Sequence, residues 1–311
     1  MRPGDLALAK ELGRKLRKFS KKVSLPGILD DENLVCLIEQ IVDSIRRIKY
    51  IKLISGFEIS TINIDTNSNL FDPIKGAIYH FNSGNFDEAC WLIFLAIHFG
   101  KNKRTGWTLA RLVYAGGKKR PYWTWKKITK NTNEFLIWLN SNAPALKENG
   151  SFGNHRKYES CNAYKGRGTG SAIISYIEWV GPDLNHNAKF EKFYLVAPND
   201  PRGVFDQLFN SLSQVITFGR TAKFDYLTML GKLGFIKCVP GRAYLQDATG
   251  PLRGARLLFG GSTDAPIGAD ELEMLISDLE KDLDLFYGMQ VIEDSLCNWQ
   301  KKPDLFEHFS G

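Results

Sequence analysis

One carboxylate, Asp225, stands in a setting that suits a catalytic group. It lies in residues 218–235, FGRTAKFDYLTMLGKLGF, after a glycine turn and two cations, Arg220 and Lys223. The leucines that follow at three-residue spacing predict a short helix that Asp225 opens and Gly234 ends. A rigidly held acid of this kind stabilises positive charge that develops in a reaction. The structural alternative is an ordinary helix N-cap.

A second group of chemical side chains follows a glycine in residues 151–160, SFGNHRKYES. It combines a histidine, two cations, a tyrosine and an acid, namely His155, Arg156, Lys157, Tyr158 and Glu159. A turn with these groups suits a phosphate or base pocket, and the alternative is a self-satisfied charge cluster at the surface. Glu159, Glu88 and Glu293 are rivals of Asp225 for the role of catalytic carboxylate.

A long basic window lies between Glu88 and Glu134, where no acidic residue occurs. Its cations include Lys101, Lys103, Arg104, Lys118, Lys119, Arg120, Lys126 and Lys127. Aromatic residues are interleaved with them, including Trp123 and Trp125. Cations for phosphates and flat rings for unstacked bases are what a nucleic-acid surface needs. The alternative is a solvated basic face with the tryptophans in the core.

Two further cationic segments could hold phosphates. Residues 5–22 predict a cationic helix with one apolar stripe, which is either a phosphate-binding arm or a solvated terminus. Gly250 and Pro251 start a predicted helix whose first turn carries Arg253, and backbone N–H groups at such a start can bind a phosphate. By contrast, the GRGTG sequence at 166–170 lacks the following GKS/T of a P-loop.

The remaining pattern predicts an all-α or α-dominated chain of about ten helices. Residues 91–99 are apolar on every face and predict a buried core helix, in which His98 is more plausible as a core histidine than as a catalytic one. A helix is expected from Asn133 to near Pro144. Residues 190–198, FEKFYLVAP, are the best candidate for a strand or an extended segment.

The bulk composition sets broad limits on function. The chain has 311 residues, 43% of them hydrophobic, and a formal charge of +7, which favours an anionic partner. Five cysteines are far apart without a CxxC pair, which indicates reduced thiols and no zinc site. No apolar run is long enough for a membrane span. We therefore expect a cytoplasmic protein without membrane association, metal, cofactor or obligate protein partner.

Five motifs together resemble a known family. They are NFDEACWLIFLAIHFGK, GSFGNHRKYES, FGRTAKFDYLTMLGKLG, TGPLRGARLLFGG and EDSLCNWQK, within residues 70–301. As a set they look like the α-glutamyl/putrescinyl thymine pyrophosphorylase-like family, a divergent branch of the helix-hairpin-helix DNA glycosylase superfamily that bacterial anti-phage DNA glycosylases also resemble. Asp225 would match the superfamily aspartate. The chain departs from the pattern in that only Thr217-Phe218-Gly219 fills the place of the preceding hairpin.

The resemblance implies two helical lobes around a central cleft. It further implies a basic N-terminal helical extension at 1–65 and a glycosylase-like catalytic region at 66–311, with lobes at about 66–180 and 181–311. The expected activity is that of a DNA glycosylase which flips and excises a hypermodified pyrimidine, such as a glucosylated hydroxymethylcytosine, from phage DNA. This would leave abasic sites and serve anti-phage defence.

Each candidate residue has an expected role in that reaction. Asp225 would stabilise the sugar cation, His155 and Glu159 would assist the departing base, and Lys223 is an alternative amine nucleophile. Trp123, Trp125 and Tyr158 are candidates for base stacking. The cations expected to bind DNA are Arg104, Lys118, Lys119, Arg120, Lys126, Lys127, Arg156, Lys157, Arg220 and Arg253.

Two other functions remain open at this point. The first is an amine transferase, or pyrophosphorylase, that acts on a pyrophosphorylated thymine-like base in DNA. The second is a non-catalytic protein that senses modified DNA.

Overall fold

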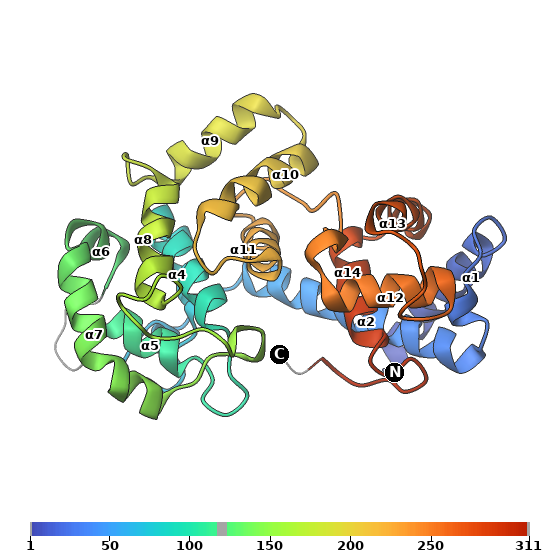
Figure 1. Ribbon diagram of the computed structural model, residues 1–311, viewed down its shortest axis with the longest axis horizontal. Coiled ribbons are helices and arrows are strands. Elements are labelled where there is room, and N and C mark those ends of the chain that lie inside the picture. Colours follow the sequence, from blue (N-terminus) through green and yellow to red (C-terminus); the bar gives the residue numbers. More distant parts are fainter. Residues whose placement is uncertain (1, 117–122, 310–311) are drawn as a thin grey trace. The chain divides into compact units, whose positions relative to one another are not determined.

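The computed structural model describes residues 2–116 and 123–309 (Figure 1). Within these residues every regular element is helical, and strand-type pairing is limited to one isolated bridge between Asn102 and Gly106. The prediction of an all-α fold is therefore confirmed. No described helix is both long enough and apolar enough to traverse a lipid bilayer.

The chain forms two compact units, one from residues 1–51 and 240–310 and the other from residues 52–239. The sequence-based division into an extension at 1–65 and a catalytic region at 66–311 stays a prediction. Spatial compactness does not define which segments carry the chemistry.

The first unit combines an N-terminal and a C-terminal segment of the chain. Its helices are α1 (Leu6–Phe19), most of α2 (Asp31–Ile54), α12 (Thr249–Gly260), α13 (Ala269–Leu283) and α14 (Gly288–Trp299), with short 3₁₀ turns at Pro3–Asp5, Pro26–Ile28 and Leu245–Asp247. The apolar stripe of α1 is buried in the core of this unit through Leu12, Leu16 and Phe19. Because that stripe packs against the core, α1 is a docked helix and not a frayed terminus.

Helices α12 and α14 can pack closely because α12 has glycines at the contact. A Cβ atom on Gly254 would lie 2.2 Å from the carbonyl oxygen of Leu296, and one on Gly250 would lie 2.7 Å from Sγ of Cys297. The glycines of the TGPLRG motif therefore allow two helix backbones to approach closely. This packing gives the motif a structural reason that is independent of phosphate binding.

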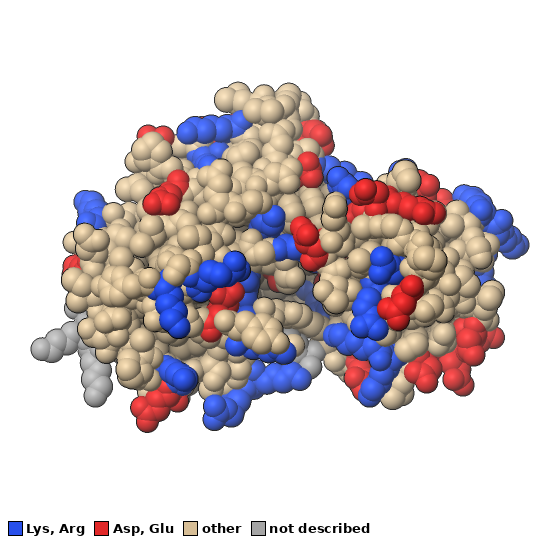
Figure 2. Space-filling view, in the orientation of Figure 1, with Lys and Arg blue, Asp and Glu red and all other residues tan. Residues whose placement is uncertain are grey.

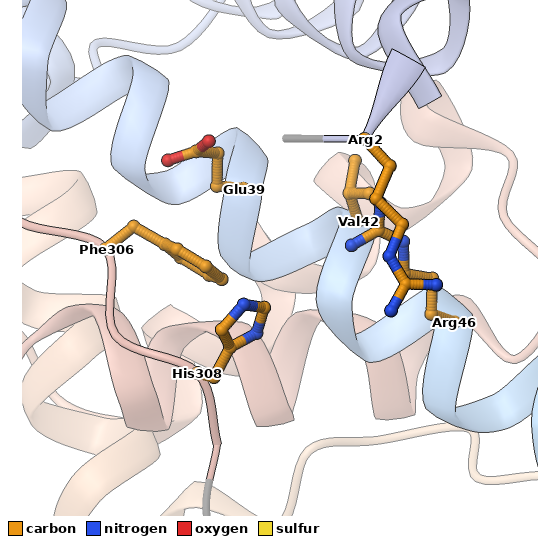
Figure 3. A pocket seen from close by; sticks show the side chains of 6 residues that line it. All are labelled: Arg2, Glu39, Val42, Arg46, Phe306 and His308. Atoms are coloured by element: carbon orange, nitrogen blue, oxygen red, sulfur yellow. The ribbon is translucent and has the colours of Figure 1, made fainter. Parts of the chain in front are cut away.

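The C-terminal segment after α14 runs along α2. Gln40 donates to the carbonyl oxygen of Glu307 at 3.0 Å, and Nδ1 of His308 lies 3.2 Å from Asp43. Figure 3 shows Phe306 and His308 opposite α2, where they line a cavity of about 200 Å³ with Arg2, Glu39, Val42 and Arg46. Arg46 is already paired with Asp5. The cavity thus mixes acidic, basic and apolar groups and is not specialised for an anion.

The second unit is built around α4. Its helices are α3 (Pro73–Asn82), α4 (Phe86–Phe99), α5 (Thr108–Ala115), α6 (Trp125–Lys130), α7 (Thr132–Asn149), α8 (Thr169–Val180), α9 (His186–Val196), α10 (Pro201–Ser211) and α11 (Arg220–Lys232), with 3₁₀ turns at Thr61–Asn63, Asn154–Arg156 and Leu212–Gln214. Helices α3, α5, α6, α9 and α11 all pack against α4. Its residues from Ala89 to Ala96 are all buried, which confirms the predicted core helix.

Two sequence-based predictions of secondary structure were wrong, one in the type of element and one in the end of a helix. The strand candidate at 190–198 is helical as far as Val196, because the side chain of Asn185 accepts from the backbone N–H of Ala188 and caps α9. Of the aromatic residues in this segment, Phe190 alone is fully buried. Helix α7 does not end near Pro144 but continues to Asn149. Tertiary packing of Leu146 explains the continuation, since that side chain is buried beyond the proline.

We predict that Gly254→Ala destabilises the first unit. Alanine favours a helix, but its methyl group would collide with the backbone of α14, and such overpacking lowers the free energy of unfolding by about 1–3 kcal/mol. Urea denaturation followed by circular dichroism measures the change. Gly4→Ala is the matched control, since nothing lies within 4 Å of its Cβ position. Equal stability of the two variants would contradict the packing argument.

Candidate active site

Asp225 is positioned by the interior of α11 and not by its start. The helix begins at Arg220, five residues earlier, and its N-cap is Gly219 with an extended backbone and no side-chain cap. The prediction that Asp225 opens the helix was therefore wrong. Without a capping side chain the sequence carries no mark of the true start, whereas the predicted end is close, since Gly234 follows the helix with φ +74°.

The residues of the HRKYE cluster point in different directions. Arg156 is 8% exposed and buried in the second unit, while His155, Lys157 and Tyr158 are exposed. Tyr158 is 90% exposed. The cluster is thus neither a single pocket nor a self-contained surface group, because one cation enters the protein and its neighbours face solvent.

The Arg156 guanidinium connects three segments of the second unit. Its Nε donates to the carbonyl oxygen of Ile97 in α4 at 3.0 Å, and Nη1 donates to the carbonyl oxygen of Thr217 at 3.2 Å. Nη1 also lies 3.9 Å from a carboxylate oxygen of Glu159. Burial lowers the pKa of Arg156, whereas the charges of Asp225 and Glu159 raise it. The guanidinium therefore stays charged between these two acids.

Asp225 and Glu159 are thus the two rival carboxylates that share one cation. Burial raises the pKa of Glu159, and Arg156 partly opposes this shift. Glu88 is committed elsewhere, since it accepts from Tyr114 at 2.7 Å and from the backbone N–H of Trp125 at 2.8 Å. Glu293 is buried in the first unit. Among the described residues of the second unit, these two carboxyl groups beside one guanidinium are the best candidates for catalysis.

The other predicted catalytic side chains have different surroundings. Lys223 donates to Oγ of Ser213 at 3.0 Å, and its ammonium lies 4.2 Å from the centre of the Phe209 ring. These contacts hold Lys223 against α10. His155 is exposed next to the Arg156 site.

The two predicted stacking tryptophans lie in the core. Trp123 and Trp125 are each 4% exposed, and Nε1 of Trp125 donates to the carbonyl oxygen of Leu184 at 2.8 Å. Their backbones also bind the core, since Nε1 of Trp91 donates to the carbonyl oxygen of Trp123. Contact with an unstacked base would require this region to open. In this conformation Tyr158 is the aromatic residue of the predicted set that reaches solvent.

Two cationic loops, residues 100–107 and residues 150–168, are joined by hydrogen bonds and form one surface. The backbone N–H of Gly153 donates to the carbonyl oxygen of Phe99 at 2.8 Å, and Asn102 donates to that of Phe152 at 2.8 Å. The exposed cations of these loops are Lys101, Lys103, Arg104, Lys157, Lys165 and Arg167. Figure 2 shows Lys and Arg side chains gathered over the region where these loops lie in Figure 1. We call this set the paired-loop surface.

The remaining predicted phosphate-binding residues are scattered. Lys118, Lys119 and Arg120 lie outside the described residues. Lys126 is exposed, and Lys127 pairs with Glu134 at 3.1 Å. Arg220 is buried, with its guanidinium 4.7 Å from the Phe224 ring centre. Arg253 is exposed in the first unit, where it lines a cavity of about 490 Å³ at the start of α12.

A buried hydrogen-bonded chain was missed by sequence reasoning. Oδ1 of Asp87 lies 2.7 Å from Nδ1 of His186, whose Nε2 lies 2.7 Å from the hydroxyl of Tyr176, and that hydroxyl lies 2.8 Å from the hydroxyl of Tyr226. Burial lowers the pKa of His186, so its neutral ring donates to Asp87 and accepts from Tyr176. Nothing in the sequence marks this chain, because its members lie on four helices.

No three His, Cys, Asp or Glu side chains lie close enough to hold a metal ion in residues 2–116 and 123–309. In comparisons with known proteins, a family model described as alpha-glutamyl/putrescinyl thymine pyrophosphorylase clade 3 matches residues 32–311. No curated protein and no solved structure matches the chain.

We predict that His98 makes the fold sensitive to acid. Burial lowers the pKa of His98 to about 3, and Arg156 contributes, whereas an unfolded histidine titrates near about 6.5. Between these values the unfolded chain binds more protons, so stability falls as the pH falls, by about 1.4 kcal/mol per pH unit. From pH 7 to pH 5, His98→Gln should therefore lose about 2 kcal/mol less stability than the unmodified protein. Urea denaturation at both pH values tests this, and parallel losses would contradict it.

Proposed function

This chain belongs to the alpha-glutamyl/putrescinyl thymine pyrophosphorylase family, clade 3, and on that premise we propose that it is a DNA glycosylase. The name of the family describes enzymes that act on a modified thymine, so a modified base in DNA is the substrate class. In our proposal the enzyme flips a hypermodified pyrimidine out of phage DNA and cleaves its N-glycosidic bond. The abasic sites that remain would block the phage and serve cytoplasmic anti-phage defence.

The observation that carries this proposal is the pair of carboxyl groups beside Arg156. Cleavage of the C1′–N1 bond leaves positive charge on the sugar and sends the bonding electrons to the base. Asp225 stabilises the sugar cation, orients the water that adds to C1′ and accepts the proton that this water loses. Glu159, whose pKa burial raises, donates a proton to the departing base. Two acids in different environments thus take different roles.

The environment of Lys223 favours hydrolysis over a lyase reaction. An amine nucleophile must be deprotonated and directed at C1′. The ammonium of Lys223 instead lies against the Phe209 ring and Ser213, and an aromatic face attracts a cation. Water is therefore the proposed nucleophile.

The paired-loop surface supports DNA as the partner. Its six exposed cations come from two loops that backbone and side-chain hydrogen bonds hold together. Tyr158 projects from the same surface, and a ring in that position can stack where a base has left the duplex. In this role Tyr158 acts as a wedge that fills the place of the displaced base. Because Glu159 follows Tyr158 directly in the sequence, the wedge and the acid move together.

The family name favours a second candidate function. In it an amine displaces pyrophosphate from a thymine-like base that stays attached to its sugar. Such a site needs several cations directed at one leaving group. Among the described cations, Lys157 is exposed while Arg156 is shared by two carboxylates, which supports excision over transfer.

We predict that Asp225→Asn lowers base release by about 10²–10³-fold because the amide cannot stabilise the sugar cation. Glu159→Gln should lower it by about 10²-fold, and the alkaline decline caused by loss of the Glu159 proton should disappear from its pH profile. The measurement is mass spectrometry of bases and pyrophosphate released from modified phage DNA. Glu178→Gln, an exposed acid on α8, is the matched control.

The products separate the three functions. Free base with abasic sites supports the glycosylase, and pyrophosphate with intact sugar supports the transferase. If Asp225→Asn protects cells from phage as well as the unmodified protein does, the chain is a sensor and the catalytic proposal fails.

We predict that Tyr158→Ala weakens binding to modified duplex DNA by about 10-fold, since stacking of one base contributes about 1–3 kcal/mol. The salt dependence of binding should not change, because stacking releases no counterions. Lys103→Ala should instead reduce the salt slope by about 1. Fluorescence anisotropy at several salt concentrations distinguishes these effects. Tyr50→Ala, another exposed tyrosine, is the control, and a Tyr158 variant that binds as tightly as this control would exclude the wedge.

A further inference from the structure

Thr217 has an unusual backbone in the turn before α11. Its φ is +68°, a left-handed value that a β-branched residue rarely adopts. The residue is buried, so the surrounding structure holds it in this conformation. Strain of this kind is found at sites where geometry serves function. The carbonyl oxygen of Thr217 accepts from Arg156, which places the strained turn at the candidate active site.

Two hydrogen-bond donors at this turn have no partner among the described residues. They are the hydroxyl of Thr217 and Nη2 of Arg156, and both are buried. Because Nη1 of the same guanidinium binds the Thr217 carbonyl at 3.2 Å, the two donors belong to one small region. Buried polar groups are nearly always hydrogen-bonded. Two unpaired donors in one region therefore indicate that a ligand or a water binds there.

The nearby His98 does not act as a third donor. The hydroxyl of Thr169 donates to the carbonyl oxygen of Ser160 at 2.9 Å and lies 3.0 Å from Nε2 of His98. Nε2 must then carry the proton that Thr169 accepts. Since burial lowers the pKa of His98 to about 3, its ring is neutral and Nδ1 is a lone-pair acceptor. The donors of the region are therefore Arg156 and Thr217.

The buried ring of Phe218 lies beside these donors. The Phe218 ring stacks on Phe94 at 5.1 Å, with an interplanar angle of 14°, and the Arg156 guanidinium lies 5.6 Å from the Phe218 ring centre. The Arg156 charge also interacts with Asp225 and Glu159. Two donors near two acids are the elements of a site for a heterocyclic leaving group. Because Phe218 is only 4% exposed, a base reaches these donors when the region opens.

We propose that Arg156 Nη2 and the Thr217 hydroxyl bind the carbonyl oxygen next to the glycosidic nitrogen of a pyrimidine. This inference rests on the proposed glycosylase function and adds two catalytic donors to it. When the C1′–N1 bond breaks, its electron pair moves to the base and is shared between N1 and O2. Donors directed at O2 stabilise that charge as it forms. In the DNA-free protein an internal water is the competing occupant of the region.

Binding of a pyrimidine anion tests the donors without requiring catalysis. The probe is 5-nitrouracil, whose ring N–H is acidic enough to ionise near neutral pH and place charge on N1 and O2. We expect the full-length protein to bind this anion more tightly than the neutral base, with affinity rising as the pH passes the pKa of the probe. Isothermal titration calorimetry at several pH values measures it.

Thr217→Val is the decisive variant, because valine is also β-branched and removes only the hydroxyl. It should weaken binding of the anion by about 10-fold and leave binding of the neutral base nearly unchanged. Thr217→Ser restores the hydroxyl and should restore affinity. Thr228→Val is the matched control, since the buried hydroxyl of Thr228 already donates to the carbonyl oxygen of Phe224 at 2.8 Å.

The outcomes are separable from those of the base-release assay. If the protein does not bind the anion, or if Thr217→Val and Thr228→Val bind it equally, the region holds water only and the inference is wrong, even if base is released from DNA. If the anion binds through Thr217 but no base is released from any modified DNA, the donors stand as a base-binding site and the glycosylase function fails.

Discussion

The second unit depends on one buried cation. The Arg156 guanidinium donates to a carbonyl near the end of α4 and to the turn before α11, and its charge lies beside Asp225 and Glu159. Removing a guanidinium from water is costly unless its charge and its donors are compensated. The two acids supply the charge and the two carbonyls supply acceptors. The 153–159 loop, α4 and α11 are therefore held in one arrangement by a single side chain.

The rotation of α11, the helix that carries Asp225, is set by the neighbouring residue Tyr226. Neighbouring residues on an α-helix point about 100° apart because there are about 3.6 residues per turn. Tyr226 is held inside the core by a series of hydrogen bonds that runs through Tyr176 and His186 to Asp87. Fixing the Tyr226 hydroxyl thus fixes the rotation of α11, the helix whose Asp225 interacts electrostatically with Arg156. A chain of neutral donors in a low-dielectric core makes this orientation strict, because a broken link leaves a buried polar atom unpaired.

Close backbone approach positions the paired-loop surface. A Cβ on Gly153 would lie 2.9 Å from the carbonyl carbon of Gly100, so the two cationic loops can meet only through glycines. This contact brings Lys101 and Lys103 to the loop that carries Tyr158. In our proposal, the DNA-binding cations and the catalytic acid Glu159 are then adjoining residues. In our proposal the same loop senses the displaced base and supplies the proton for its release.

The sequence by itself determined the helical class, the buried helix α4 and the glycine after α11, because hydrophobic period and glycine placement act locally. It also singled out Asp225, Glu159 and Arg156 as chemically capable residues, since rare charge settings are visible in the chain. Tertiary structure decided which acids meet, because residues 156 and 225 are brought together only by helix packing. It also decided that α11 starts at Arg220, that Trp123 and Trp125 are buried, and that Thr217 is strained. These outcomes follow from burial and long-range hydrogen bonds, which no local pattern encodes.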